Sequence, residues 1–202
     1  PVALTSSGTW AGVRVVGGAG TALSGLRISN AVNGLETAVS TSASDLQVSN
    51  TTASCFRVTG GTLTLTGSTG RTCGTYGLYA GTGATANVDH VVLTGASYGM
   101  WFSSGGGTTH HNTITGNTSY GAYVSSSAPL VIRDSIITSN GTYGIYVSSG
   151  VPTVDHNDLW GQSTAISGAT NALGLATDPM FVGGGDYRLQ ATSPCRGAGT
   201  AA

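Results

Sequence analysis

A short motif returns about every 22 residues along this chain and divides most of it into equal repeats. In its full form a Tyr, a Gly, a variable residue and an aromatic residue follow one another, as in residues 76–79 and 98–101. The anchor positions are 12, 34, 55, 77, 99, 121 and 144, so the steps vary only between 21 and 23 residues. A period of this length predicts stacked repeats, each too small to bury its own apolar face. Equivalent residues of successive repeats then lie side by side.

Each repeat contains short apolar alternations, which are typical of a β-strand with one buried face. The expected inward column within the motif is Val13, Leu35, Phe56, Leu78, Met100, Ala122 and Ile145. A second strand is predicted at residues 26–29, 46–49, 63–66, 91–94, 112–115 and 135–138. Asn or Gly follows each of these segments, and both tolerate the left-handed backbone of a tight corner. Strands without intervening helices predict an all-β parallel solenoid.

We expect a single domain in which residues 1–168 form about seven rungs and residues 169–202 form a non-repeating C-terminal cap. Strand-like sequence starts at Trp10, with no capping element before it. Unpaired backbone on a first rung invites pairing with another chain. We therefore expect the chain to be part of a larger extracellular protein, or to associate with another subunit or copy through its N-terminal rung.

Charge is scarce on this chain. Charged residues make up 7% of it, the formal net charge is −1, and every basic residue is an Arg. A nearly neutral surface argues against nucleic acid and anionic membranes as partners. No apolar run approaches the length that crosses a bilayer. We therefore expect neither nucleic-acid binding nor membrane insertion.

Two stretches connect these repeats with known proteins. Residues 112–117 followed by Tyr120-Gly121, and residues 136–140 followed by Tyr143-Gly144, resemble the repeats of right-handed parallel β-helix proteins of the pectate-lyase-like superfamily, and the likeness extends over roughly residues 10–165. Residues 178–181, 186–189 and 193–199 are similar to the closing segment of many secreted bacterial β-helix proteins. The resemblance implies this fold and an extracellular or cell-surface location. It does not imply one activity, because the superfamily includes lyases, glycosidases, adhesins and tailspikes.

The enzyme chemistry implied by the resemblance is largely missing from the sequence. Glycosidases of the superfamily would need an acid cluster with a Gly-His-Gly and an Arg-x-Lys segment, and neither segment occurs here. The lyases typically use Ca²⁺-binding carboxylates beside an Arg or Lys base, whereas the Arg residues of this chain are scattered.

An aromatic ladder is the first candidate site. Four successive rungs place an aromatic residue at the outward position of one strand: Tyr79, Trp101, Tyr123 and Tyr146. At about 4.8 Å per strand the stripe is roughly 14 Å long. Such rings can bind sugars or a partner protein, or they can merely stack on one another to protect the sheet. The tyrosines before each Gly are predicted to pack at the corners, and the charged residues below the ladder (Arg14, Glu36 and Arg57) are predicted to neutralise one another.

A column of imidazoles and carboxylates is the second candidate. Aligning the repeats places His90, His111, Asp134 and His156 in one column, and Asp89, His110, Arg133 and Asp155 in the column before it. Such a ladder could hold a metal or an acid/base pair, and the candidates for glycosidase-like catalysis are Asp134, Asp155, His156 and Asp158. Polar side chains at a tight corner can equally well serve only the turn backbone, and we expect no resident metal or cofactor.

Three cysteines complete the inventory. Cys55 and Cys73 lie less than one period apart and could be bridged, or they and Cys195 could be small buried residues. Taken together, these features favour a non-catalytic secreted or cell-surface protein, adhesin-like or structural, whose aromatic face binds a neutral polysaccharide or another protein. The alternative is a polysaccharide-degrading enzyme, either a hydrolase or a lyase.

Overall fold

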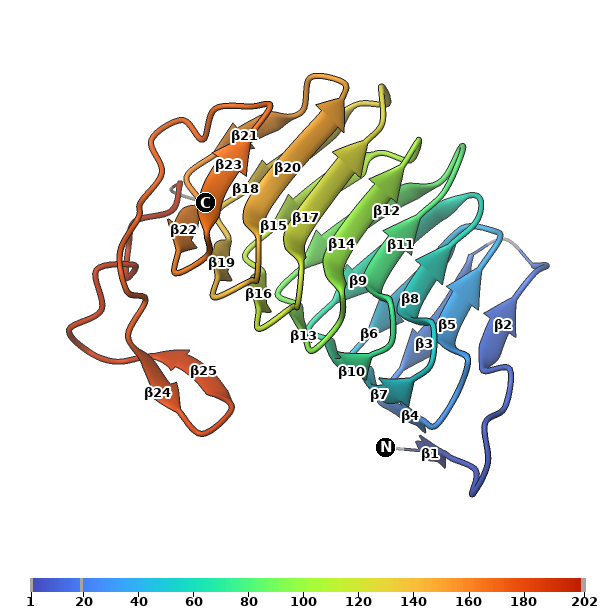
Figure 1. Ribbon diagram of the computed structural model, residues 1–202. Helices are drawn as coiled ribbons and strands as arrows, with labels where there is room; N and C mark the ends of the chain where they lie inside the picture. The colour runs from blue at the N-terminus through green and yellow to red at the C-terminus, as the bar shows by residue number, and fades with distance from the viewer. Residues whose placement is uncertain (1, 19, 201–202) are drawn as a thin grey trace.

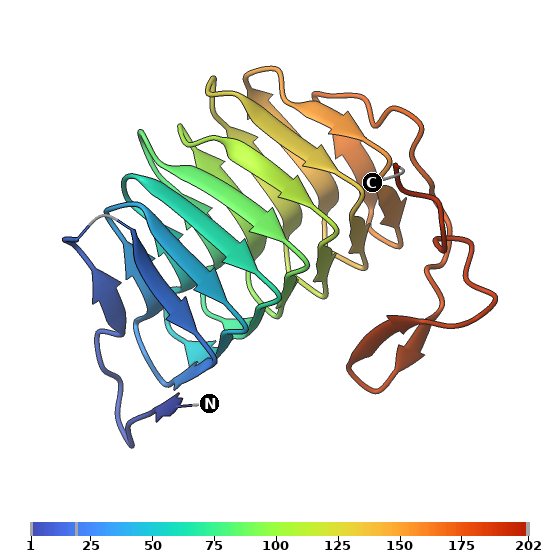
Figure 2. The ribbon, with the colours of Figure 1, turned by 180° about the vertical axis from the view of Figure 1, so that it is seen from behind.

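The structure is a computed structural model that describes residues 2–18 and 20–200, and it confirms the parallel β-solenoid (Figure 1). Within the solenoid, strands that follow one another in the chain belong to different sheets, so each coil adds one strand to each of three parallel sheets. The sheets run along the whole stack, and the two opposite views show the strands of each sheet arranged like rungs (Figures 1 and 2). No helix long and apolar enough to span a membrane occurs among the described residues.

The strands divide among the sheets as follows. The first sheet contains β1 (Val2–Leu4), β4 (Leu26–Ser29), β7 (Gln47–Thr51), β10 (Thr69–Cys73), β13 (Val92–Thr94), β16 (Thr113–Thr115), β19 (Ile136–Thr138) and β22 (Asp158–Trp160). The second, which we call the aromatic sheet, contains β2 (Val13–Val15), β5 (Asn33–Thr37), β8 (Ser54–Val58), β11 (Tyr76–Ala80), β14 (Tyr98–Ser103), β17 (Tyr120–Ser125), β20 (Tyr143–Ser149) and β23 (Thr164–Ser167). The third contains β3 (Thr21–Ser24), β6 (Thr41–Ser44), β9 (Thr62–Thr66), β12 (Thr85–Asp89), β15 (Gly107–His110), β18 (Leu130–Arg133) and β21 (Thr153–Asp155).

The predicted core column is confirmed by the strand register. Leu35 pairs with Phe56, and Leu78 pairs with both Phe56 and Met100. All of these side chains are buried. Because parallel strands stack residue on residue, the apolar period of the sequence becomes a continuous column of core contacts along the solenoid.

The number of coils and one strand differ from the sequence prediction. The aromatic sheet has eight strands, because β23 continues the stack without the Tyr-Gly motif. The first sheet begins at Val2, ahead of Trp10. Residues 63–66 belong to β9 of the third sheet, and in that coil the first sheet is formed by β10. Only Gly70 and Cys73 of β10 are buried, so no alternation of large apolar residues marks this strand.

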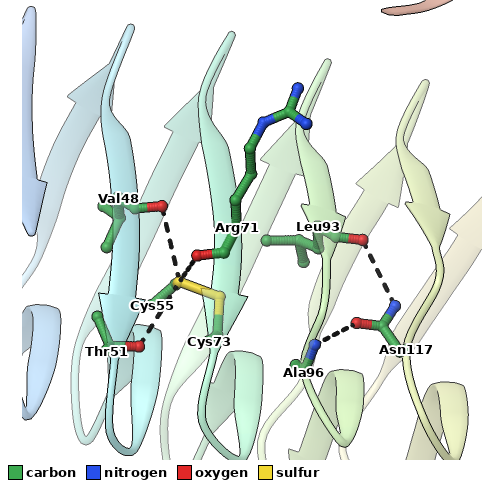
Figure 3. The surroundings of a disulfide bond; sticks show 8 residues. All are labelled: Val48, Thr51, Cys55, Arg71, Cys73, Leu93, Ala96 and Asn117. Atoms are coloured by element: carbon green, nitrogen blue, oxygen red, sulfur yellow. Dashed lines mark hydrogen bonds between the residues drawn. A yellow bond between two sulfur atoms is a disulfide. The ribbon is translucent and has the colours of Figure 1, made fainter. Parts of the chain in front are cut away.

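Corner residues of two kinds hold successive coils together. Asn30, Asn50 and Gly116 have the left-handed backbone that the sequence predicts, with φ of 57°, 53° and 65°. Asn117 and Asn140 instead point their amides into the stack. Asn117 Oδ1 accepts a hydrogen bond from Ala96 N at 3.0 Å, and its Nδ2 donates to Leu93 O at 3.4 Å (Figure 3). Each such amide satisfies buried backbone groups of the neighbouring coil, as burial requires.

Cys55 and Cys73 are joined by a disulfide, which decides between the alternatives that the sequence leaves open (Figure 3). Both residues are buried, and the bond links β8 to β10 across a sequence separation of 18. Closing a loop of this size stabilises a fold by about 3 kcal/mol. Cys195 is a free thiol.

The C-terminal segment covers one end of the stack and then runs along the first sheet. Ala172 and Leu175 continue the ladder beyond Asp155 and Asp158. An antiparallel hairpin follows, formed by β24 (Phe181–Gly183) and β25 (Asp186–Leu189), drawn in red in Figures 1 and 2. Arg71 of β10 donates to Gly185 O at 3.3 Å, which ties the hairpin to the first sheet.

Candidate functional site

The aromatic sheet carries eight rings on its outer face, in strands β11, β14, β17 and β20. In each strand the Tyr before the Gly and the aromatic residue after it are partly exposed, whereas the two residues between them are buried. The Gly is needed because the backbone turns inward there: a Cβ atom on Gly99 would lie 2.5 Å from Gly121 O. Two outward positions per strand therefore bring two columns of rings onto one face.

In the column formed by the tyrosines before each Gly, three rings form a stacked ladder, and the Tyr76 ring is tilted by 40° against that of Tyr98. The rings of Tyr98 and Tyr120 have centroids 5.0 Å apart and planes 9° apart, and Tyr120 and Tyr143 follow at 5.6 Å and 4°. Each of these tyrosines is the first residue of its strand, directly after a corner, and the rings pack on one another along the stack. Their rings stand on the outer face because the two buried residues that follow each Tyr, the Gly and its successor, both lie on the inner side of the strand.

The second column contains the predicted binding residues in the predicted register. Tyr79 pairs with Trp101, Trp101 with Tyr123, and Tyr123 with Tyr146. The Trp101 ring is turned by 81° from that of Tyr79 and by 72° from that of Tyr123. Its Nε1 donates to Ser125 Oγ at 2.9 Å. Unlike the stacked ladder, this column presents rings in several orientations.

The electrostatics of this face are nearly neutral. Burial and then the neighbouring tyrosines raise the pKa of Tyr120, so its phenol stays uncharged at physiological pH. The predicted neutralisation below the ladder is confirmed: Glu36 lies 2.9 Å from Arg14 Nε and 3.6 Å from Arg57 Nε. The guanidinium of Arg57 also lies over the Tyr79 ring, 4.9 Å from its centroid.

Three of the four catalytic candidates line one cavity of about 240 Å³ between the first sheet and the C-terminal segment. Asp134, His156 and Asp158 lie there together with His111 and Cys195. Asp155 is not among the lining residues, and its Oδ1 is 3.7 Å from His156 Nδ1.

The two cavity carboxylates already have partners in the C-terminal segment. Asp134 Oδ1 accepts from Thr200 N at 2.7 Å, and its Oδ2 accepts from Thr200 Oγ1 at 2.8 Å. Burial raises the pKa of Asp134, but these two hydrogen bonds and the Arg133 guanidinium outweigh it, so the pKa lies below its ordinary value.

Asp158 is held by hydrogen bonds in the same way, but its pKa is shifted in the opposite direction. Its Oδ1 accepts from Thr177 N at 3.0 Å, and its Oδ2 accepts from Cys195 Sγ at 3.3 Å. Burial raises the pKa of Asp158 despite these hydrogen bonds. Burial, followed by the Asp158 carboxylate, raises the pKa of Cys195 to about 11, so its thiol stays protonated and unreactive.

The imidazole column gathers at one corner of the stack. Asp89 Oδ1 lies 2.7 Å from His90 Nδ1 and 3.0 Å from the Nδ1 atoms of both His110 and His111. Burial alone would raise the pKa of Asp89. The hydrogen bonds with His111 and His90 have a larger, opposite effect, so the pKa lies below its ordinary value. This cluster brings the two predicted columns into direct contact.

Comparison with known families agrees with this architecture. The family described as "Right handed beta helix region" matches residues 54–169, which is more than half of the chain. The chain belongs to the right-handed β-helix family. No curated protein and no solved structure matched it. The fold of this family is generally that of pectate-lyase-like and adhesin-like proteins.

The matched region of this right-handed β-helix includes all eight rings and the whole imidazole corner. Sequence reasoning found the Tyr79 column and the corner residues because the period aligns them. It missed Thr177, Cys195 and Thr200 as partners of the carboxylates. These contacts join residues 19, 37 and 66 positions apart in segments outside the repeat, so no periodic signal marks them.

Proposed function

We propose that this right-handed β-helix is a non-catalytic, adhesin-like protein of the cell surface or extracellular space that binds a neutral glycan on its aromatic sheet. The observation that carries the proposal is the double column of eight partly exposed rings on four successive strands. Rings combine apolar surface with phenol hydroxyls and an indole, the groups that neutral sugars contact in binding sites. Exposed aromatic patches of this extent mark interaction surfaces.

The charge distribution supports a neutral ligand. The charged groups at the lower end of the rings, Arg14, Glu36 and Arg57, are engaged with one another. A polyanion would need unpaired basic residues along the face, since its affinity depends on neutralising its charges.

The state of the carboxylates supports binding over hydrolysis. Glycoside hydrolysis needs one carboxyl group that donates a proton and another that acts as base or nucleophile. Both oxygens of Asp134 and both oxygens of Asp158 accept hydrogen bonds from the C-terminal segment. Their arrangement fits anchoring of that segment.

A glycan array tests the proposal with Trp101→Ala as the loss variant. Trp160→Ala is the matched control, because Trp160 is a 42% exposed tryptophan on the first sheet, away from the rings. We expect binding of a neutral glycan by the natural chain and by Trp160→Ala, a loss of at least about tenfold for Trp101→Ala, corresponding to about 1.4 kcal/mol, and no product release.

Other outcomes contradict the proposal. Release of reducing ends or unsaturated sugars would favour the polysaccharide-degrading alternative. Absence of binding to any glycan would leave the aromatic sheet to a protein partner or to structural stacking.

A further inference from the structure

We propose that the corner formed by Asp89, His110 and His111 binds one divalent transition-metal ion of the zinc, cobalt, nickel or copper class. This proposal is independent of the aromatic sheet. Asp89 ends β12 and His110 ends β15, and the register of the third sheet pairs the two residues. His111 follows with a left-handed backbone, φ 53°, and this turn brings its ring to the same side as His110.

The three ligand atoms form a small triangle. Asp89 Oδ1 is 3.0 Å from His110 Nδ1 and 3.0 Å from His111 Nδ1, and the two nitrogens are 3.0 Å apart. Around a tetrahedral zinc with bonds of about 2.0–2.1 Å, ligand atoms lie about 3.3 Å apart. The triangle therefore needs only a small expansion to accept an ion.

The chemistry of the cluster favours a cation in its centre. The two imidazole nitrogens face each other, and both face the same carboxylate oxygen. Without an ion, each close pair of these three atoms needs one proton donor and one acceptor. An ion accepts the inward lone pair of every member at once. Two nitrogen ligands and one carboxylate select transition metals over Ca²⁺ and Mg²⁺, which prefer all-oxygen sites.

Neighbouring groups leave the site accessible and support its carboxylate. The side chains of Asp89, His110 and His111 are 31%, 28% and 41% exposed, so an ion can enter from solvent. His90 Nδ1 lies 2.7 Å from Asp89 Oδ1 and can orient it as an outer-sphere partner. Arg133, which follows His110 in its column, has its Nε 3.6 Å from Asp134 Oδ2, so its charge is partly compensated.

Calorimetric titration of the full chain with zinc chloride tests the site. We expect one ion per chain, and affinity at least about tenfold weaker in His110→Ala and in His111→Asn. The matched control is His156→Asn. His156 has the same left-handed corner backbone, φ 50°, and an aspartate neighbour, but it is not part of the triangle. Asn is used at both corners because it tolerates that backbone.

A second readout separates binding from folding. Zinc should raise the thermal midpoint of the natural chain and of His156→Asn, but not that of the two ligand variants. If His111→Asn does not fold, His110→Ala decides the question, since His110 lies in a strand with no special backbone requirement. Equal zinc affinity in the natural chain and His110→Ala, or equal loss in His156→Asn, would overturn the assignment.

Discussion

At the residue scale, the glycine of each motif determines how closely successive coils approach. A Cβ atom on Gly121 would lie 2.5 Å from Gly144 O and 2.9 Å from Asn140 Nδ2. Real Cβ atoms do not approach backbone oxygens so closely, so any larger residue must push adjacent coils apart. The same glycine allows the flanking aromatic residues to share the outer face.

Gly121→Ala is therefore expected to lower the free energy of unfolding by about 1–3 kcal/mol. Urea denaturation followed by circular dichroism measures this. Gly17→Ala is the control, because a Cβ atom there meets nothing within 4 Å, and it should be nearly neutral. An unchanged denaturation midpoint for Gly121→Ala would contradict the role of the close approach.

The buried carboxylate of Asp134 gives a pH-dependent prediction. Its pKa is lowered in the folded state, so ionised Asp134 stabilises the fold at pH values above its unfolded pKa of about 3.9, and this contribution is lost as the pH falls through the lower folded pKa. Asp134→Asn should lack the contribution. The stability difference between the natural chain and the variant should thus be largest at neutral pH and decrease as the pH falls below the unfolded pKa.

Urea denaturation of both chains between neutral pH and about pH 3, a range that extends below the unfolded pKa, measures this difference. A difference that stays constant over the range would show that the hydrogen bonds to Thr200 do not depend on ionisation.

At the element scale, the strands of the aromatic sheet are joined by ring stacking as well as by backbone hydrogen bonds. Tyr120 of β17 is stacked between Tyr98 and Tyr143. The sequence predicted the strands of this sheet well, because its core column has large apolar residues at a constant period. It failed at β10, where Gly70 takes the place of a large core residue, and it therefore assigned residues 63–66 to the wrong sheet.

Replacement of the central tyrosine tests the stacking contribution. Tyr120→Ala removes both stacked contacts of the ring, with Tyr98 and Tyr143, as well as its edge-on contact with Tyr123 and its tilted contact with Tyr146. Loss of the two stacked pairs alone should cost about 1–3 kcal/mol, since an aromatic pair contributes about 0.5–1.5 kcal/mol beyond its buried area. Tyr120→Phe keeps the ring and should be nearly neutral. Thermal or urea unfolding distinguishes them, and equal stability of Tyr120→Ala and Tyr120→Phe would show that the ladder does not stabilise the sheet.

At the scale of the whole molecule, the solenoid separates two kinds of surface. In the two views no described segment lies over the outer side of the aromatic sheet, whereas the first sheet is contacted by the C-terminal segment (Figures 1 and 2). The repeats were predictable because stacking turns a sequence period directly into neighbours in space. The course of residues 169–200 was not, because it depends on single contacts such as Arg71 to Gly185 and Asp134 to Thr200.

The central claim is that ligand is bound on the aromatic sheet, and the fluorescence of Trp101 tests it most directly. In a chain carrying Trp10→Phe and Trp160→Phe, Trp101 is the single remaining tryptophan. Titration of this chain with neutral polysaccharides should shift the Trp101 emission in a saturable way for the same glycan that the natural chain binds. Binding of that glycan with no change in Trp101 emission, or no binding of any neutral glycan, would contradict the claim.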